Sequence, residues 1–142
     1  MNRALTNKYI QLLNEKKLEH DQRKDILRRF VEYVGNELKL EGKYPRVVLN
    51  NAENFAQTNK SFGHFNMAEN KIVISSSNRN LADILRTLAH EMVHYKQKQS
   101  GSLKLDNLSN DGADGSDIEN EANSVAGILL RKYGREHPEI YE

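Results

Sequence analysis

Residues 81–99 of the 142-residue chain read LADILRTLAHEMVHYKQKQ. Apolar residues recur in this segment at spacings of three and four, which predicts a helix with one buried face. The residues of that face are Leu81, Leu85, Leu88 and Met92. Asn78 or Asn80 can cap the helix, because an asparagine side chain accepts hydrogen bonds from the first backbone N–H groups. The helix should therefore begin just after one of these residues and run to about Gln99.

The same helix carries the pattern H-E-x-x-H as His90, Glu91 and His94. Because residues four apart lie on one helix face, the two imidazoles can converge on a single ion. The apolar stripe faces roughly away from them, so they occupy a polar face. Glu91 lies about 100° around the helix from His90, beside such an ion but not necessarily on it. The pattern predicts zinc and a glutamate that can accept a proton from water.

A catalytic zinc needs three protein ligands and one open position, so a third ligand should lie downstream. In the helix predicted over residues 117–134, Glu119 and Glu121 flank the buried stripe on opposite sides. Asn123 lies four residues after Glu119 and can accept the second N–H of a zinc-bound histidine. This spacing favours Glu119 as the ligand. The other candidates are Asp106, Asp111, Asp114, Asp117, Glu121 and His137.

The rest of the chain is assigned from apolar spacing and from turn-forming residues. We expect two N-terminal helices, an antiparallel hairpin and a long loop rich in Gly, Asn, Asp and Ser. The elements are, in order, helices over 4–17 and from Asp21, a strand over 46–50, a hairpin over 61–75 whose second strand is 71–75, a loop over 100–116 and a last helix from Ser116 or Asp117 to Gly134.

Composition excludes several classes of protein. The chain has no cysteine, which excludes disulfides, thiolate metal sites and a cysteine nucleophile. The net charge is +1, so no nucleic-acid or membrane partner is expected. No apolar run matches a membrane span or a signal peptide, and we expect a cytoplasmic protein. A single domain is expected over residues 1–142, with a helical part over 1–45 and a zinc-binding core over 46–134.

H-E-x-x-H followed by a helix bearing E-x-x-x-N is similar to the gluzincin zinc metallopeptidases. The segment from Ile118 to Ala126, IENEANSVA, most resembles the small ImmA/IrrE-like peptidases. The similarity covers about residues 61–133, although Val125 stands where that family usually has phenylalanine. The resemblance implies three zinc ligands, a general base and a residue that supports one ligand. These are His90, His94 and Glu119 as ligands, Glu91 as the base, and Asn123 beside His90.

The expected fold is therefore α+β and minimal zincin-like: a small antiparallel sheet packed against the H-E-x-x-H helix and the C-terminal ligand helix, with two N-terminal helices. The expected function is zinc-dependent hydrolysis of peptide bonds in a protein or peptide substrate, through a zinc-activated water and Glu91. We expect the strand Ile72–Ser75 to be an edge on which a peptide can add as a further strand. The residue that stabilises the oxyanion stays open among Tyr95, Tyr133, His64 and His137.

Two other classes of function stay open at this point. The first is a catalytically inactive zinc-binding module with a structural or protein-interaction role, which would have no open coordination position. The second is a nucleic-acid-binding module; the chain lacks the interleaved aromatic residues expected of one, and its overall charge is near zero. Its basic residues would be Arg23, Lys24, Arg28 and Arg29.

Overall fold

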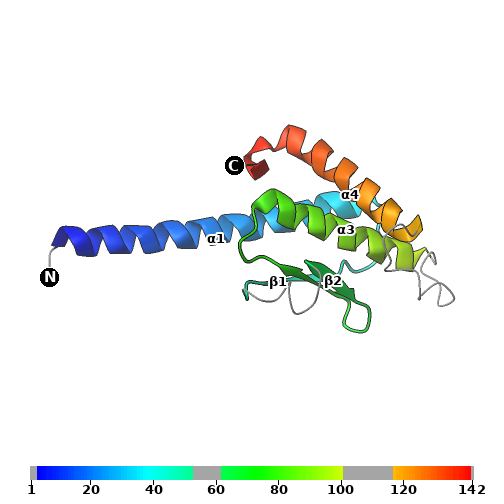
Figure 1. The fold of residues 1–142 in the computed structure, drawn as a ribbon, viewed down its shortest axis with the longest axis horizontal. Helices are drawn as coiled ribbons and strands as arrows, with labels where there is room; N and C mark the ends of the chain where they lie inside the picture. Colours follow the sequence, from blue (N-terminus) through cyan, green and yellow to red (C-terminus); the bar gives the residue numbers. More distant parts are fainter. Residues whose placement is uncertain (1–2, 53–61, 101–116, 142) are drawn as a thin grey trace.

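The computed structural model describes residues 3–52, 62–100 and 117–141. Within them the chain forms three α-helices, a short 3-10 helix and a three-stranded sheet, an α+β arrangement (Figure 1). The elements are α1 (Arg3–Glu37), β1 (Arg46–Asn50), β2 (Gly63–Asn66), β3 (Lys71–Ser75), α3 (Leu81–Gln99), α4 (Asp117–Glu136) and η2 (Pro138–Tyr141). Except for Ser100, the loop expected over 100–116 lies outside the described residues.

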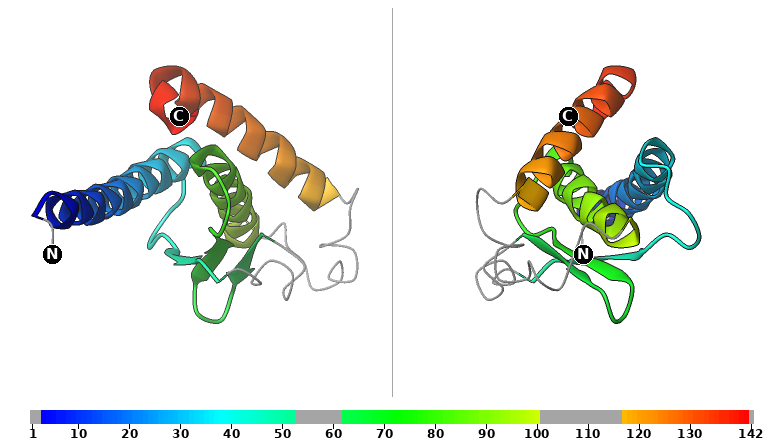
Figure 2. Two further views of the ribbon diagram at one scale, coloured as in Figure 1. Left: turned by 60° about the vertical axis from the view of Figure 1, so that its left-hand side comes forward. Right: turned by 90° about the vertical axis from the view of Figure 1, so that its right-hand side faces the viewer.

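Helix α3 is the centre of the molecule, between the sheet on one side and α4 on the other (Figures 1 and 2). Its apolar face is fully buried, as the spacing of its residues predicted. The core combines Phe30 and Val34 of α1, Ile72 and Ile74 of β3, Leu85, Leu88 and Met92 of α3, and Leu130 and Tyr133 of α4. In the described ranges, no helix has both the length and the hydrophobicity needed to cross a membrane.

The prediction of two N-terminal helices is wrong, because α1 is continuous from Arg3 to Glu37. Asp21 was expected to begin a second helix. Residues 18–20 contain neither glycine nor proline, and an aspartate inside a helix costs less than about 1 kcal/mol relative to alanine. Nothing in the local sequence therefore stops the helix before Asp21. The buried face predicted for its second half is confirmed by Phe30 and Val34, which have no exposed surface.

The predicted antiparallel sheet is corrected to a mixed one, with strand order β1-β3-β2. β2 and β3 form the predicted antiparallel hairpin, with Phe65 opposite Ile72. β1 pairs with the other side of β3 and runs parallel to it. β3 is therefore the central strand and not the edge that we expected. Its consecutive apolar residues Ile72, Val73 and Ile74 are all buried, which is typical of a central strand covered on both faces.

The boundaries of α3 agree with the prediction. Asn80 is the N-cap, and its side-chain oxygen accepts a hydrogen bond of 2.9 Å from the backbone N–H of Asp83. α4 begins at Asp117 but continues two residues beyond Gly134. Gly134 is buried because the Tyr141 hydroxyl lies where a side chain would be, 2.5 Å from an ideal Cβ. This glycine therefore makes room for a packing contact and does not end the helix.

Gly63, the first residue of β2, lies directly against α3. A Cβ at this position would be 2.6 Å from Cγ2 of Thr87 and 3.6 Å from Cγ of Glu91. The Thr87 hydroxyl is also fixed, since it accepts a hydrogen bond of 2.6 Å from Arg79 and donates to the carbonyl of Asp83. The missing side chain at Gly63 thus sets how closely β2 approaches the helix that carries the two histidines.

We expect Gly63→Ala to destabilise the protein by about 1–3 kcal/mol, because the added methyl group overpacks the contact with Thr87. The double variant Gly63→Ala/Thr87→Ser should recover most of that loss, since serine lacks Cγ2 but keeps the hydroxyl. Chemical denaturation of the two variants, with Thr87→Ser alone as control, measures the effect. Equal stability of Gly63→Ala and the wild type would show that β2 does not depend on this close contact.

Candidate metal centre

His90 and His94 lie one turn apart on α3, and their side chains point to the same place. The two Nε2 atoms are 3.1 Å apart, and the side chains are 18% and 15% exposed. The helical spacing of the two residues predicts this convergence. The surrounding helix is buried at Leu88, Ala89 and Met92, so the position of both imidazoles is set by a rigid part of the core.

The packing of α4 against α3 brings Glu119 to the same point. One carboxylate oxygen of Glu119 lies 2.7 Å from Nε2 of His90, and the other lies 3.2 Å from Nε2 of His94. These residues form the one group of three or more metal-ligating side chains found among the described residues. Glu121, the alternative on the same helix, is not in the group.

These three residues fit zinc in both donor type and spacing. Two imidazole nitrogens and one carboxylate oxygen are a common ligand set of catalytic zinc. With zinc–ligand distances of about 2.0–2.1 Å, the donor atoms of a tetrahedral site are about 3.3–3.4 Å apart. The separations of 2.7, 3.1 and 3.2 Å among His90, His94 and Glu119 are close to that value. A small expansion of the triad would accommodate the ion.

Each histidine of the triad is held by an amide side chain. Asn123, four residues after Glu119, hydrogen-bonds His90. Gln97 holds His94: its Oε1 lies 2.8 Å from Nδ1 of His94. Because an amide oxygen only accepts, Nδ1 carries a hydrogen, and Nε2 faces the triad.

Gln97 is a residue of the site that the sequence analysis missed. It is 2% exposed, and its Nε2 donates to the backbone carbonyl of Ile118 (3.1 Å) and to the carboxylate of Glu121 (2.9 Å). These two bonds fix the orientation of the amide and tie the end of α3 to the first turn of α4. The available signal was its spacing, since a residue three positions after His94 lies on the same helix face.

Glu91 lies next to the triad without belonging to it. The residue is 8% exposed, and its side chain runs close to Gly63 of β2. Burial raises the pKa of the Glu91 carboxyl to about 7; the charge of Glu119 also raises it, and His94 lowers it. Near neutral pH this carboxyl can therefore both release and accept a proton.

The environment of His90 favours the neutral ring that binds metals. Burial lowers the pKa of His90, and the neighbouring His94 lowers it further, against the opposing effects of Glu119 and Asn123. A neutral imidazole offers its lone pair to a metal without first losing a proton.

Two further histidines, His64 and His137, lie away from the triad. His137 stacks on Tyr133, with ring centroids 4.2 Å apart, and lies 3.3 Å from Glu139. His64 is exposed on β2, next to Phe65, whose ring packs against Tyr95 of α3. Since neighbouring strand residues point to opposite faces, His64 faces away from α3.

Tyr95 was one of four candidates for stabilising an oxyanion. Its hydroxyl instead donates a hydrogen bond of 2.6 Å to the backbone carbonyl of Lys43, and its side chain is buried. The hydroxyl is therefore hydrogen-bonded to the segment that connects α1 to β1. The assignment of an oxyanion-stabilising residue stays open.

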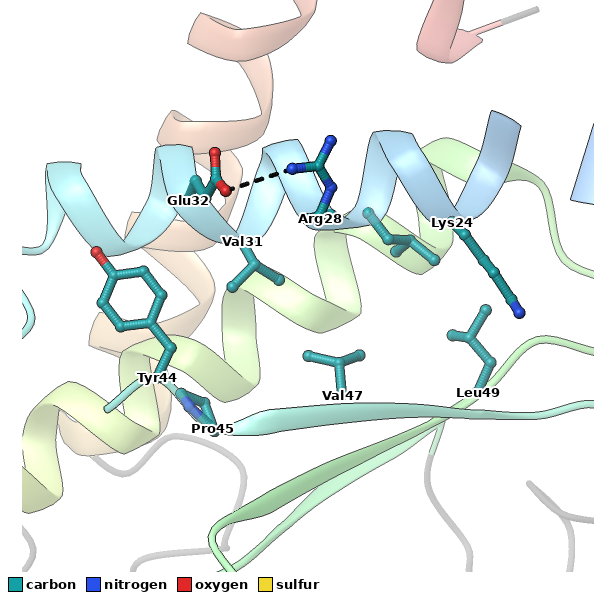
Figure 3. Close-up of a pocket in the computed structure, with 9 residues that line it drawn as sticks. Lys24, Arg28, Val31, Glu32, Tyr44, Pro45, Val47 and Leu49 are labelled. Atoms are coloured by element: carbon teal, nitrogen blue, oxygen red, sulfur yellow. Dashed lines mark ion pairs between the residues drawn. The ribbon is translucent and has the colours of Figure 1, made fainter. Parts of the chain in front are cut away.

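A separate cavity of about 580 Å³ opens between α1 and β1 (Figure 3). Its lining is mainly apolar and includes Val31, Tyr44 and Val47, with the Arg28–Glu32 ion pair drawn beside it. No residue of the triad lines it. The cavity therefore belongs to the packing between helix and edge strand, away from the candidate metal centre.

The chain matches no protein-family model, no curated protein and no solved structure in comparisons with each. A functional conclusion must therefore come from the chemistry of this site.

We expect purified protein to bind one zinc ion per chain, and His90→Ala, His94→Ala and Glu119→Ala each to weaken binding severely. Losing a ligand should cost more than the roughly 10–100-fold that loss of a supporting hydrogen bond costs. Glu121→Ala is the matched comparison: it removes a carboxylate of the same helix that only accepts a hydrogen bond from Gln97, so its cost should stay within that smaller range. Elemental analysis and competition with a chelating dye provide the measurement. Retention of zinc by Glu119→Ala would show that another residue is the third ligand.

The raised pKa of Glu91 predicts a pH-dependent stability for the metal-free protein. The unfolded chain loses this proton near the ordinary value of 4.5 and the folded chain near 7, so stability falls as pH rises through this range. The shift corresponds to roughly 3 kcal/mol at pH values above 7. In excess chelator, the melting temperature of Glu91→Gln minus that of the wild type should therefore increase from pH 5 to pH 8. A difference that does not change with pH would contradict the burial of a charged carboxylate.

Proposed function

We propose that the protein is a zinc-dependent peptidase in which Glu91 is the general base. The observation that carries this proposal is the position of Glu91, a buried carboxyl beside a triad that does not include it. A zinc that only stabilises a fold is closed by four protein ligands and needs no such neighbour. The triad of the described residues supplies three ligands, which leaves a coordination position for water or substrate.

His90, His94 and Glu119 would hold the zinc ion, with Asn123 and Gln97 orienting the two imidazoles. When bound, zinc supplies Lewis acidity, which makes water a better acid and polarises a carbonyl group. The protein contributes a fixed and largely buried set of donors. Because Gln97, the partner of His94, is itself bonded to α4, His94 needs little reorganisation when the ion enters.

Glu91 would move the proton in the reaction. Its carboxylate takes a proton from the attacking water as the new C–O bond forms at the scissile carbonyl. It then gives that proton to the leaving nitrogen as the C–N bond breaks. A pKa of about 7 suits both transfers near neutral pH, because neither protonation state is strongly disfavoured.

The substrate would lie along the side of α3 that carries Glu91, next to β2. Gly63, the first residue of β2, lies against Thr87 and Glu91 of α3. An extended protein or peptide substrate bound near this contact would pass beside the general base. β3, the strand on which a peptide was expected to add, is instead the central strand of the sheet and pairs on both sides.

Glu91→Gln separates catalysis from metal binding. Glutamine keeps the volume of the side chain but cannot accept the proton, so hydrolysis of an unfolded protein substrate should fall by roughly 10²–10⁴-fold. Zinc content should stay at one ion per chain, because no ligand is removed. Rate, zinc stoichiometry and melting temperature are measured on one preparation, with Glu136→Gln as the control, since Glu136 is exposed near the other end of α4.

Two outcomes would refute the proposal. A rate within a few-fold of wild type would remove Glu91 from the mechanism. A wild-type protein that binds zinc stoichiometrically but cleaves no unfolded protein or peptide would instead be the catalytically inactive zinc-binding module.

A further inference from the structure

A cavity of about 510 Å³ lies between α3 and α4, beginning at the metal ligand His90. It follows the two helices away from the triad, on the side where Asn123 hydrogen-bonds His90. Its polar lining comes from both helices and includes two arginines, Arg86 and Arg131, but no carboxylate. The cavity therefore extends the candidate metal centre with a region of positive charge.

The two arginines reach this cavity from opposite walls. Arg86 lies on α3 four residues before His90, and so on the same helix face one turn away. Arg131 lies on α4 four residues after Gly127. Its Nη1 atom is 3.3 Å from the position that a Cβ of Gly127 would occupy, so the guanidinium folds back over this glycine. The absence of a side chain at Gly127 allows the charge to lie along the helix toward the triad.

Neither guanidinium is neutralised by a carboxylate of the described chain, since no ion pair there includes Arg86 or Arg131. Arg28 and Arg29 on α1 differ, because both form ion pairs with Asp25, at 2.6 and 2.9 Å. Two arginines that face one cavity and have no ion-pair partner in the described parts of the chain form an arrangement that attracts an anion. The planar guanidinium matches a carboxylate in particular, through two parallel hydrogen bonds.

We infer that this cavity, the Arg86–Arg131 pocket, binds a carboxylate of the substrate and so makes the enzyme prefer acidic peptides. The inference rests on the proposed peptidase function. His90 is a wall of the pocket and also a ligand of the triad, so an occupant of the pocket is adjacent to the reacting bond. The carboxylate comes either from an aspartate or glutamate side chain near the scissile bond or from the C-terminus of the peptide.

The first experiment maps cleavage sites. The zinc-loaded protein is incubated with a mixed peptide library, and the new termini are sequenced by mass spectrometry. We expect aspartate and glutamate to be enriched at a fixed position relative to the cleaved bond, or cleavage at a fixed distance from a free C-terminus. Two matched peptides separate these sources: one with an acidic side chain and an amidated C-terminus, and one with neutral side chains and a free C-terminus.

The second experiment tests the arginines. In Arg86→Gln/Arg131→Gln, the ratio of kcat/KM for the preferred acidic peptide to that for its neutral, amidated counterpart should fall roughly ten- to a hundredfold. Arg135→Gln is the control, because Arg135 is exposed one turn further along α4 and does not line the pocket. The inference would be overturned if kcat/KM fell equally for both peptides, which leaves the ratio unchanged. It would also be overturned if the wild type showed no preference for acidic peptides.

A binding assay keeps the two proposals distinguishable. Fluorescence anisotropy measures the affinity of zinc-loaded Glu91→Gln protein for the same labelled peptides, with and without the two arginine substitutions. If the wild type cleaves nothing but the acidic peptide binds more tightly and needs both arginines, the peptidase proposal fails and the pocket stands. If binding shows no acidic preference, the pocket fails whatever the protein hydrolyses.

Discussion

The crossing of α4 over α3 is the contact on which the rest of the site depends. It places the carboxylate of Glu119 within 3.2 Å of both histidine Nε2 atoms. Ala126 and Leu130 of α4 pack in the apolar core and fix this crossing. At one end of α3, Gln97 hydrogen-bonds both His94 and the first turn of α4. Because Gln97 both joins the helices and orients His94, the geometry of the triad and the stability of the fold are coupled.

A second constraint acts from the sheet. Gly63 brings β2 so close to α3 that Glu91 lies beneath its backbone, and the resulting burial raises the pKa of Glu91 to about 7. The closeness of β2 thus accounts for the protonation behaviour of the proposed general base. The pocket with Arg86 and Arg131 lies beyond His90 between the helices, so Glu91, the triad and this pocket all adjoin the segment of α3 around His90.

Local patterns were sufficient for those parts of the chain in which neighbouring residues determine the outcome. The stripe from Leu81 to Met92 and the cap at Asn80 predicted α3, and the turn residues predicted the β2–β3 hairpin. Local patterns failed at Asp21, which was expected to begin a second helix but lies inside the continuous helix α1. They also failed for β1, because a parallel neighbour distant in the sequence has no turn that reveals its pairing.

The sequence by itself determined the relative positions of the two imidazoles and the neighbouring carboxyl, because these follow from the spacing of His90, Glu91 and His94 on a helix. It also placed Glu119 and Asn123 on one face of α4, which is why both lie at His90 in the structure. Only the tertiary structure decided how deeply Glu91 is buried, that Gln97 holds His94, and that Arg131 joins Arg86 across a cavity. These features depend on how separate elements pack. That packing results from many weak contacts, which cannot be predicted from local sequence spacing.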